Sequence, residues 1–264
     1  MIQIQHVSKT YDNRNIIKDI SFRVEKGESF GIIGPNGSGK STLLKLCSGI
    51  EKSNKGTIQI NGNKMYTYSR KHLAKWIGVL QQEALPLVGF SVREVVEMGR
   101  YPYQNWMGTE KQDTEQLITD IMEKLEIEPL KNRTLEQLSG GERQRVALGK
   151  VMAQQPQILM LDEPTTYLDI GHQVQMMDYI RNWQLQNQLT VISVLHDLNL
   201  AAMYCDRLLL LHEGKIVKVG TPTEVLKSEL ISQVYGTEPI IFSHPELEVP
   251  QLLLKSQLAH FSEG

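Results

Sequence analysis

The hydrophobic positions of the chain fall into two patterns, which predict two kinds of strand. Three stretches alternate apolar and polar side chains, as half-buried strands do: residues 2–5, 20–24 and 56–60. Four others are short apolar runs, typical of strands that are covered on both faces: residues 29–33, 77–80, 158–161 and 190–194. The pattern therefore predicts a parallel core sheet with an antiparallel β layer beside it.

Helical patterns fill the interval between the strands at residues 77–80 and 158–161. Capping boxes, in which Ser or Thr precedes Glu or Gln by three positions, begin at Ser91, Thr109 and Ser139. Apolar residues at i, i+3, i+4 spacing run from Leu117 to Leu125. We therefore expect a helical subdomain at about residues 85–155, inserted between two strands of an α/β core.

The rest of the chain continues the alternation of helices and strands. A helix at about residues 171–186 precedes the strand at residues 190–194, and residues 208–211 and 215–219 read as a hairpin around Glu213 and Gly214. We expect one domain over residues 1–236. Residues 237–264, with three prolines, form a C-terminal tail to which the pattern assigns no role.

Composition narrows the classes of partner. The chain has 264 residues, 41% of them hydrophobic, a net charge of −2 and a pI near 6.4. This net charge does not produce the overall positive potential that would favour nucleic acid as a partner. Two cysteines, Cys47 and Cys205, form neither a disulfide framework nor a metal cluster. No apolar run approaches the roughly 20 residues of a membrane helix, and no signal peptide is apparent, so we expect any membrane role to come through a partner.

A glycine-rich stretch after residues 29–33 fits the phosphate-loop pattern G-x-x-x-x-G-K-[ST] at every fixed position. Its residues are Gly34, Pro35, Asn36, Gly37, Ser38, Gly39, Lys40 and Ser41, followed by Thr42 at the start of a helix. A strand, a glycine loop and a helix N-terminus expose backbone N–H groups to a polyphosphate, with Lys40 reaching the β- and γ-phosphates and Ser41 ligating Mg²⁺. A glycine-rich turn with a solvated lysine is the alternative, but the Lys-Ser pair between a strand and a helix favours a nucleoside triphosphate site.

Polar side chains follow the other apolar strands, where ligands of parallel sheets gather. Asp162 suits a Mg²⁺ partner acting through water, and Glu163 could accept a proton from an attacking water. His196 could bond the γ-phosphate, and Gln81 could touch metal and water. Glu163, His196 and Gln81 each have an ordinary alternative: a helix-start carboxylate, a capping or core histidine and a solvated glutamine. Tyr11, in the first turn, could stack on a purine or simply pack against a neighbour.

The run LSGGERQ at residues 138–144 resembles the signature of ATP-binding-cassette (ABC) ATPases. It lies between the phosphate loop and residues 158–164, and residues 165–169 and 196–197 continue the likeness, which covers about residues 1–236. The resemblance implies an α/β phosphate-loop NTPase of the ABC ATPase type: a parallel core sheet, an antiparallel β layer and a helical subdomain. It also implies ATP hydrolysis with Mg²⁺.

The resemblance also implies residue roles. Tyr11 would stack on adenine, Gln81 would sense the metal, Glu163 would be the catalytic base and His196 the switch histidine. Family members dimerise head to tail, so Ser139, Gly140 and Gly141 would close over the ATP of a second copy. Asp169 would communicate across that homodimer.

A further stretch, GRYP at residues 99–102, resembles ATPases that serve iron–siderophore, haem and cobalamin import. A polar helix end stopped by a proline is the alternative. The importer reading implies transmembrane permease subunits, an extracytoplasmic substrate-binding protein that acts indirectly, and a peripheral location on the cytoplasmic face of the cell membrane. Candidate permease contacts are Leu85, Leu87, Val88 and Tyr101.

Two other classes remain open. A soluble ABC ATPase acting on ribosomes or DNA usually has two cassettes or a long coiled coil, and the chain shows neither. A regulatory nucleotide-binding module without turnover would not need Glu163 and His196, both of which are present.

Overall fold

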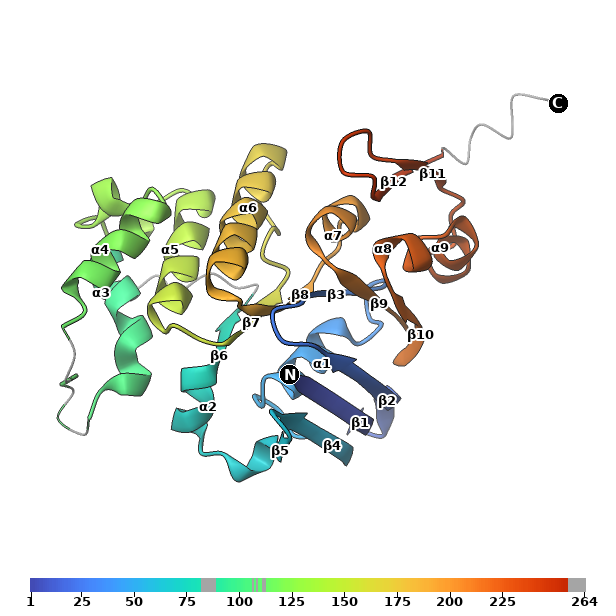
Figure 1. Ribbon diagram of the computed structural model, residues 1–264, viewed down its shortest axis with the longest axis horizontal. Coiled ribbons are helices and arrows are strands. Elements are labelled where there is room, and N and C mark those ends of the chain that lie inside the picture. The colour runs from blue at the N-terminus through green and yellow to red at the C-terminus, as the bar shows by residue number, and fades with distance from the viewer. Residues whose placement is uncertain (82–88, 106, 108, 111–112, 256–264) are drawn as a thin grey trace. The chain divides into compact units, whose positions relative to one another are not determined.

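The computed structural model describes residues 1–81, 89–105, 107, 109–110 and 113–255 (Figure 1). The chain forms two compact units, which are described separately below. The first unit combines Met1–Gly62 with Ser193–Gly264, and the second is Asn63–Ile192. Strand β8 (Thr190–Val194) spans the boundary between them. Among the described residues, no helix is both long and apolar enough to cross a membrane.

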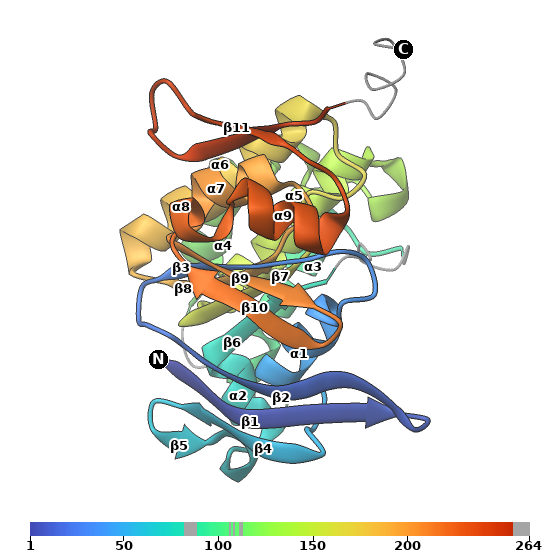
Figure 2. The ribbon, with the colours of Figure 1, turned by 90° about the vertical axis from the view of Figure 1, so that its right-hand side faces the viewer.

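The first unit opens with an antiparallel layer in the order β2-β1-β4, visible in Figure 2. Its strands are β1 (Ile2–Tyr11), β2 (Arg14–Val24) and β4 (Lys55–Ile60). Ile2 pairs with Val24 on one side and with Ile60 on the other, and all three side chains are buried. The alternation of apolar and polar positions therefore produces the predicted half-buried layer.

The same unit contains the parallel pair β3 (Ser29–Ile33) and β9 (Arg207–His212), and β10 (Lys215–Gly220) adds to β9 in antiparallel orientation. All five residues of β3 are buried, as the apolar run predicted. The helices of this unit are α1 (Lys40–Cys47), α7 (Leu198–Tyr204), α8 (Pro222–Val225) and α9 (Ser228–Tyr235).

The C-terminal segment, for which no structure was predicted, contains a hairpin of β11 (Ile240–Ser243) and β12 (Pro250–Leu253). Asn199 on α7 attaches it, because its Oδ1 accepts a hydrogen bond from Leu252 N–H at 2.7 Å and its Nδ2 donates to Leu252 O at 3.3 Å. Pro250 is the first residue of β12, a position that proline tolerates, and Pro239 and Pro245 lie outside the two strands.

The second unit pairs β6 (Ile77–Leu80) in parallel with β7 (Ile158–Asp162). Its short N-terminal elements are β5 (Asn63–Lys64), η1 (Met65–Thr67) and α2 (Arg70–Trp76). The expected helical insertion contains α3 (Val92–Glu97), η2 (Met98–Tyr103), α4 (Glu115–Lys124), η3 (Glu128–Leu130), η4 (Leu135–Gln137) and α5 (Gly140–Ala153). Helix α6 (Ile170–Asn187) follows β7.

The capping boxes have mixed outcomes. Those at Ser91 and Ser139 are confirmed as the starts of α3 and α5. The helix start at Thr109 is wrong, because α4 begins at Glu115, and Gln112 lies outside the described residues. Thr109 instead closes a loop on Asn105: its N–H donates to Asn105 Oδ1 at 3.1 Å and its carbonyl accepts from Asn105 N–H at 2.9 Å.

Arg100 in η2 anchors the helical insertion. Its side chain is 4% exposed and forms a two-point ion pair with Glu110. Nη1 also donates to Ala153 O at 2.7 Å and to Gln155 Oε1 at 2.8 Å, and the guanidinium lies 4.1 Å from the ring centre of Tyr103. One buried cation thus joins η2, the following loop and the end of α5.

We expect Arg100→Ala to lower the free energy of unfolding by about 3 kcal/mol, because it leaves the Glu110 carboxylate, only 13% exposed, without its partner. Urea unfolding followed by circular dichroism measures this. Arg93 provides the matched control, since its ion pairs with Glu97, at 2.8 Å, and with Glu115 are more exposed, and Arg93→Ala should cost about 1 kcal/mol or less. Equal losses in the two variants would contradict an anchoring role for Arg100.

Candidate functional site

The glycine loop connects β3 to α1, as the sequence predicted. Gly39 precedes α1 with φ 105°, a left-handed conformation that side chains rarely adopt, and a Cβ there would meet Ile17 Cδ1 at 2.9 Å. At Gly34 a Cβ would stand 2.1 Å from Leu211 O, so only glycine allows β9 to approach. The loop backbone is therefore held close to its neighbours, with α1 beginning directly after it.

The polar groups of this loop suit a polyphosphate. Lys40 is 5% exposed, and its ammonium group bends back over the loop to donate to Gly34 O at 2.9 Å and Pro35 O at 3.1 Å. Ser38 Oγ is buried and has no hydrogen-bond partner among the described residues. The first turn of α1 holds no acidic residue that would oppose an anion. An orphaned hydroxyl, a buried cation and an open helix N-terminus together fit bound phosphate groups.

Two contacts that support the loop were not predicted. Gly214, in the β9–β10 turn, donates its N–H to Ser38 O at 3.1 Å and accepts from Lys18 N–H on β2 at 2.8 Å. Tyr235, at the end of α9, receives a hydrogen bond from the Gly34 backbone, while burial raises the pKa of its hydroxyl to about 12. The turn around Gly214 was visible in the sequence, but nothing around Tyr235 indicated a link to the loop.

Tyr11 ends β1 in the same unit and is 38% exposed. Its hydroxyl donates to Glu51, and burial together with this hydrogen bond raises its pKa to about 12. Lys9 Nζ lies 4.7 Å from the ring centre and 3.2 Å from Glu51 Oε2. The ring is thus fixed in a polar cluster at the surface, and stacking on adenine stays a prediction.

His196 also belongs to the first unit. It is exposed and follows Leu195, whose N–H donates to Ile32 O on β3 at 3.2 Å. Asp197 then caps α7, accepting from Asn199 N–H at 2.8 Å and Leu200 N–H at 3.0 Å. The neighbouring aspartate therefore does the capping, and His196 is placed one residue beyond the strand contact, at the edge where β3 enters the glycine loop.

In the second unit, β6 and β7 bring two predicted residues to one edge. Leu80 and Leu161 are paired in register, so Gln81 and Asp162 follow at the same end of adjacent strands. Gln81 is exposed, whereas Asp162 is 8% exposed. Next to Asp162, Glu163 is half-buried with a φ of 54°, and its carboxylate accepts from Thr166 Oγ1 at 3.3 Å. A positive φ is unusual for a residue with a side chain, and it bends the chain directly after β7.

The signature turn begins α5. Ser139 Oγ accepts from Glu142 N–H at 3.3 Å, and Glu142 Oε2 accepts from Ser139 N–H at 2.7 Å. Hydrogen bonds from the backbone N–H and the side chain of Ser139 to the Glu142 carboxylate hold the pKa of that carboxyl below its usual range. Further along the chain, after β7, Asp169 caps α6. A contact that the sequence did not predict joins the regions: buried Gln144 donates its Nε2 to Pro164 O at 3.0 Å, next to Glu163.

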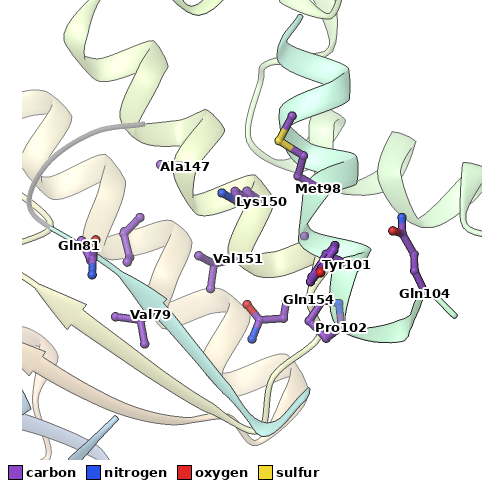
Figure 3. A pocket seen from close by; sticks show the side chains of 12 residues that line it. Val79, Gln81, Met98, Tyr101, Pro102, Gln104, Ala147, Lys150, Val151 and Gln154 are labelled. Atoms are coloured by element: carbon purple, nitrogen blue, oxygen red, sulfur yellow. The ribbon is translucent and has the colours of Figure 1, made fainter. Parts of the chain in front are cut away.

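A cavity of about 680 Å³ lies between β6, η2 and α5 (Figure 3). Val79, Ala147 and Val151 give it apolar walls, and Gln81 lines one end. Lys150, Gln104 and Gln154 add polar groups. Tyr101, one of the predicted permease contacts, lines it and is 74% exposed. Leu85, Leu87 and Val88 lie outside the described residues.

The donor groups present also bear on Mg²⁺. In the part of the chain that the structure describes, no three His, Cys, Asp or Glu side chains cluster as a metal site. Ser41 and Asp162 offer single oxygen ligands. This suits Mg²⁺, which usually takes one or two protein ligands and completes its shell with water and substrate phosphates.

The glycine loop, its buried lysine and the strand-end carboxylates define a phosphate-loop ATPase. A family model described as ABC transporter matches residues 17–166. The petrobactin import ATP-binding protein FpuC of Bacillus anthracis is 37% identical, over 93% of this chain and 90% of that protein. The hemin import ATP-binding protein HmuV of Thermobifida fusca (strain YX) is 39% identical, over 94% of this chain and 87% of its own. The chain belongs to the ABC transporter family, and it binds and hydrolyses ATP.

Solved structures agree on the fold. A putative metal-chelate type ABC transporter in an inward-facing conformation matches with a TM-score of 0.84 at 24% identity, covering 98% of each chain. A dimeric ATP-binding cassette in a post-hydrolysis state, bound to ADP and Pi, matches with a TM-score of 0.73 at 27% identity, over 84% of this chain and 98% of the other. The predicted α/β ABC ATPase fold is confirmed.

Proposed function

We propose that this chain is the ATP-hydrolysing subunit of a membrane importer for an iron–siderophore, haem or related metal chelate. The observation that carries the proposal is similarity over more than nine-tenths of the chain to the ATP-binding proteins of petrobactin and hemin import. The alternative, a soluble ATPase acting on ribosomes or DNA, has no such support. Nucleic acid is accordingly not proposed as a partner.

We propose the following roles at the nucleotide. Tyr11 stacks on adenine, residues 34–42 hold the phosphates, and Lys40 neutralises the β- and γ-phosphate charge. Glu163 accepts the proton of the attacking water, and His196 bonds the γ-phosphate. The supporting observations are the buried ammonium of Lys40, the unpartnered Ser38 hydroxyl and the positive φ of Glu163 directly after β7.

Ser41 and Asp162 would hold Mg²⁺, Asp162 through water, with Gln81 sensing both metal and water. When bound, Mg²⁺ supplies charge neutralisation at the β- and γ-phosphate oxygens. Asp162 is suited to this because it is nearly buried and ends β7 in register with the strand that leads to Gln81.

We further propose that two copies pair head to tail. Ser139, Gly140 and Gly141 would then close over the nucleotide of the other copy, and Asp169 would communicate between the copies. A helix N-terminus capped by its own serine, with glycine at the next two positions, is suited to an anion. The dimeric cassette with ADP and Pi shows that a protein of this fold forms a dimer.

The cavity in Figure 3 is the proposed docking site for a cytoplasmic segment of the permease. Its apolar walls suit the apolar face of a helix, and exposed Tyr101 at its edge suits an interface anchor. The subunit would thus sit on the cytoplasmic face of the membrane as a peripheral protein, with a substrate-binding protein acting on it only through the permease.

We expect Tyr101→Asp to reduce co-purified permease by about tenfold or more, because a desolvated aromatic anchor is lost and a charge is introduced. ATPase activity of the isolated subunit should stay within about twofold of wild type. Tyr66→Asp is the matched control, since Tyr66 is 70% exposed but does not line the cavity, and it should leave capture unchanged. Wild-type capture by Tyr101→Asp would remove this residue from the interface.

The experiment that tests the function itself is capture of the tagged protein from gently solubilised membranes, followed by identification of what accompanies it. A polytopic permease, with ATPase activity stimulated by a substrate-binding protein, is the expected result. Recovery with ribosomes or DNA and no membrane protein would overturn the importer while leaving the ATPase unaffected.

A further inference from the structure

His172 lies on α6 three residues after Asp169, and no functional role was predicted for it. The Asp169 side chain accepts from His172 N–H at 2.9 Å, and the same oxygen, Oδ1, lies 2.8 Å from Nδ1 of the imidazole. These hydrogen bonds hold the pKa of the Asp169 carboxyl below its usual range. Because a carboxylate only accepts hydrogen bonds, Nδ1 carries the proton that points to Asp169. The ring is therefore fixed at one edge by the residue that caps its own helix.

The opposite edge of the ring faces the signature turn. A Cβ on Gly141 would stand 3.3 Å from His172 Cδ2, 3.6 Å from Cγ and 3.7 Å from Nε2, and these are its three nearest atoms. At Gly140, by contrast, nothing among the described residues lies within 4 Å of such a Cβ. Glycine at position 141 thus allows the imidazole to lie against the first turn of α5. One side chain joins the N-terminal ends of α5 and α6.

We propose that His172 is a positioning residue that holds the signature turn in a fixed relation to Asp169. The inference rests on the proposed head-to-tail dimer, in which both elements face the second copy. In that dimer, Gly140 and Gly141 approach a phosphate group and Asp169 approaches the facing protomer. The imidazole fixes the signature turn relative to Asp169, because it hydrogen-bonds to Asp169 at one edge and packs on Gly141 at the other.

The expected defect is specific to closure of the dimer. The phosphate loop proposed to bind the first nucleotide belongs to the other compact unit of the chain, whereas the contacts of His172 given above lie within its own unit. Loss of the imidazole should therefore leave binding of ATP to a single copy intact. Dimerisation in the presence of ATP, and turnover with it, should weaken.

Two substitutions test the two contacts of the ring separately. His172→Asn keeps a donor near the position of Nδ1 but removes the edge that lies on Gly141. His172→Phe keeps a ring against Gly141 but cannot donate to Asp169. In a Glu163→Gln background, which slows hydrolysis, we expect each to weaken ATP-dependent dimerisation by about 5- to 50-fold, which lies within the range of typical coupling between sites. Sedimentation velocity at saturating MgATP measures this, and a fluorescent ATP analogue titrated at low protein concentration should report an affinity within about twofold of the parent.

His6 provides the matched control. Its Nδ1 lies 2.9 Å from Asp19 Oδ1, and both residues are exposed, so the chain contains a second histidine–aspartate pair with a similar Nδ1–Oδ1 distance. His6 has a φ of 51°, which asparagine tolerates well. We expect His6→Asn to dimerise like the parent protein.

Parent-like dimerisation by both His172 variants would overturn the proposal. Parallel loss of ATP affinity and thermal stability would also overturn it, because that result describes a residue needed only for folding. If the Glu163→Gln parent itself fails to dimerise with ATP, the proposed dimer is wrong and the role of His172 falls with it. The parent alone identifies that case.

Discussion

A Glu163→Gln protein is expected to bind ATP as tightly as the wild type and to hydrolyse it about 10²–10⁴-fold more slowly. The magnitude is that of losing a general base that accepts a proton in the transition state. Glutamine has the same shape and can still accept the hydrogen bond from Thr166 Oγ1, so the turn should be preserved. Only the capacity to take up a proton is removed. Steady-state phosphate release together with equilibrium ATP binding measures the two effects.

The matched control is Glu126→Gln. Glu126 is exposed in the same compact unit and shares the unusual positive φ, at 55° against 54° for Glu163. It therefore tests whether neutralising a carboxylate at a position of positive φ by itself lowers ATP turnover. We expect turnover within about twofold of wild type. Unchanged turnover in Glu163→Gln would mean that another group is the base.

Replacing Lys40 with Ala is expected to abolish measurable ATP binding. Lys40 is the buried cation of the glycine loop, and its donors now satisfy Gly34 O and Pro35 O. Without it the polyphosphate loses the point charge that neutralises its β- and γ-phosphates. The substitution also leaves two loop carbonyls with one donor fewer, so thermal unfolding should accompany the titration.

Lys45→Ala separates this effect from general loss of charge. Lys45 lies on the same helix, α1, but is exposed and outside the loop pattern. We expect its nucleotide affinity to stay within about twofold of wild type. Tight ATP binding by a folded Lys40→Ala protein would contradict the assignment of the phosphate loop.

Much of the fold could be predicted because its signals are local. The buried strands β3, β6, β7 and β8 appear as short apolar runs, and the capped starts of α3 and α5 depend on residues within four positions of each other. The false helix start at Thr109 shows the limit of this reasoning. The capping-box residues are present, but Thr109 hydrogen-bonds to Asn105 and the Glu110 carboxylate pairs with Arg100 instead.

The sequence by itself determined that the chain is an ABC ATPase, because the phosphate loop, the signature turn and the strand-end carboxylates are each short contiguous motifs. The conformational freedom of glycine, helix capping and strand burial each depend on residues a few positions apart, so they can be recognised in the sequence. Only the tertiary structure decided what supports those motifs: Gly214 on Ser38, Gln144 on Pro164 and His172 on Gly141. The partners in these pairs lie 20 or more positions apart in the sequence. A polar residue or a glycine does not by itself specify which distant residue will pack against it.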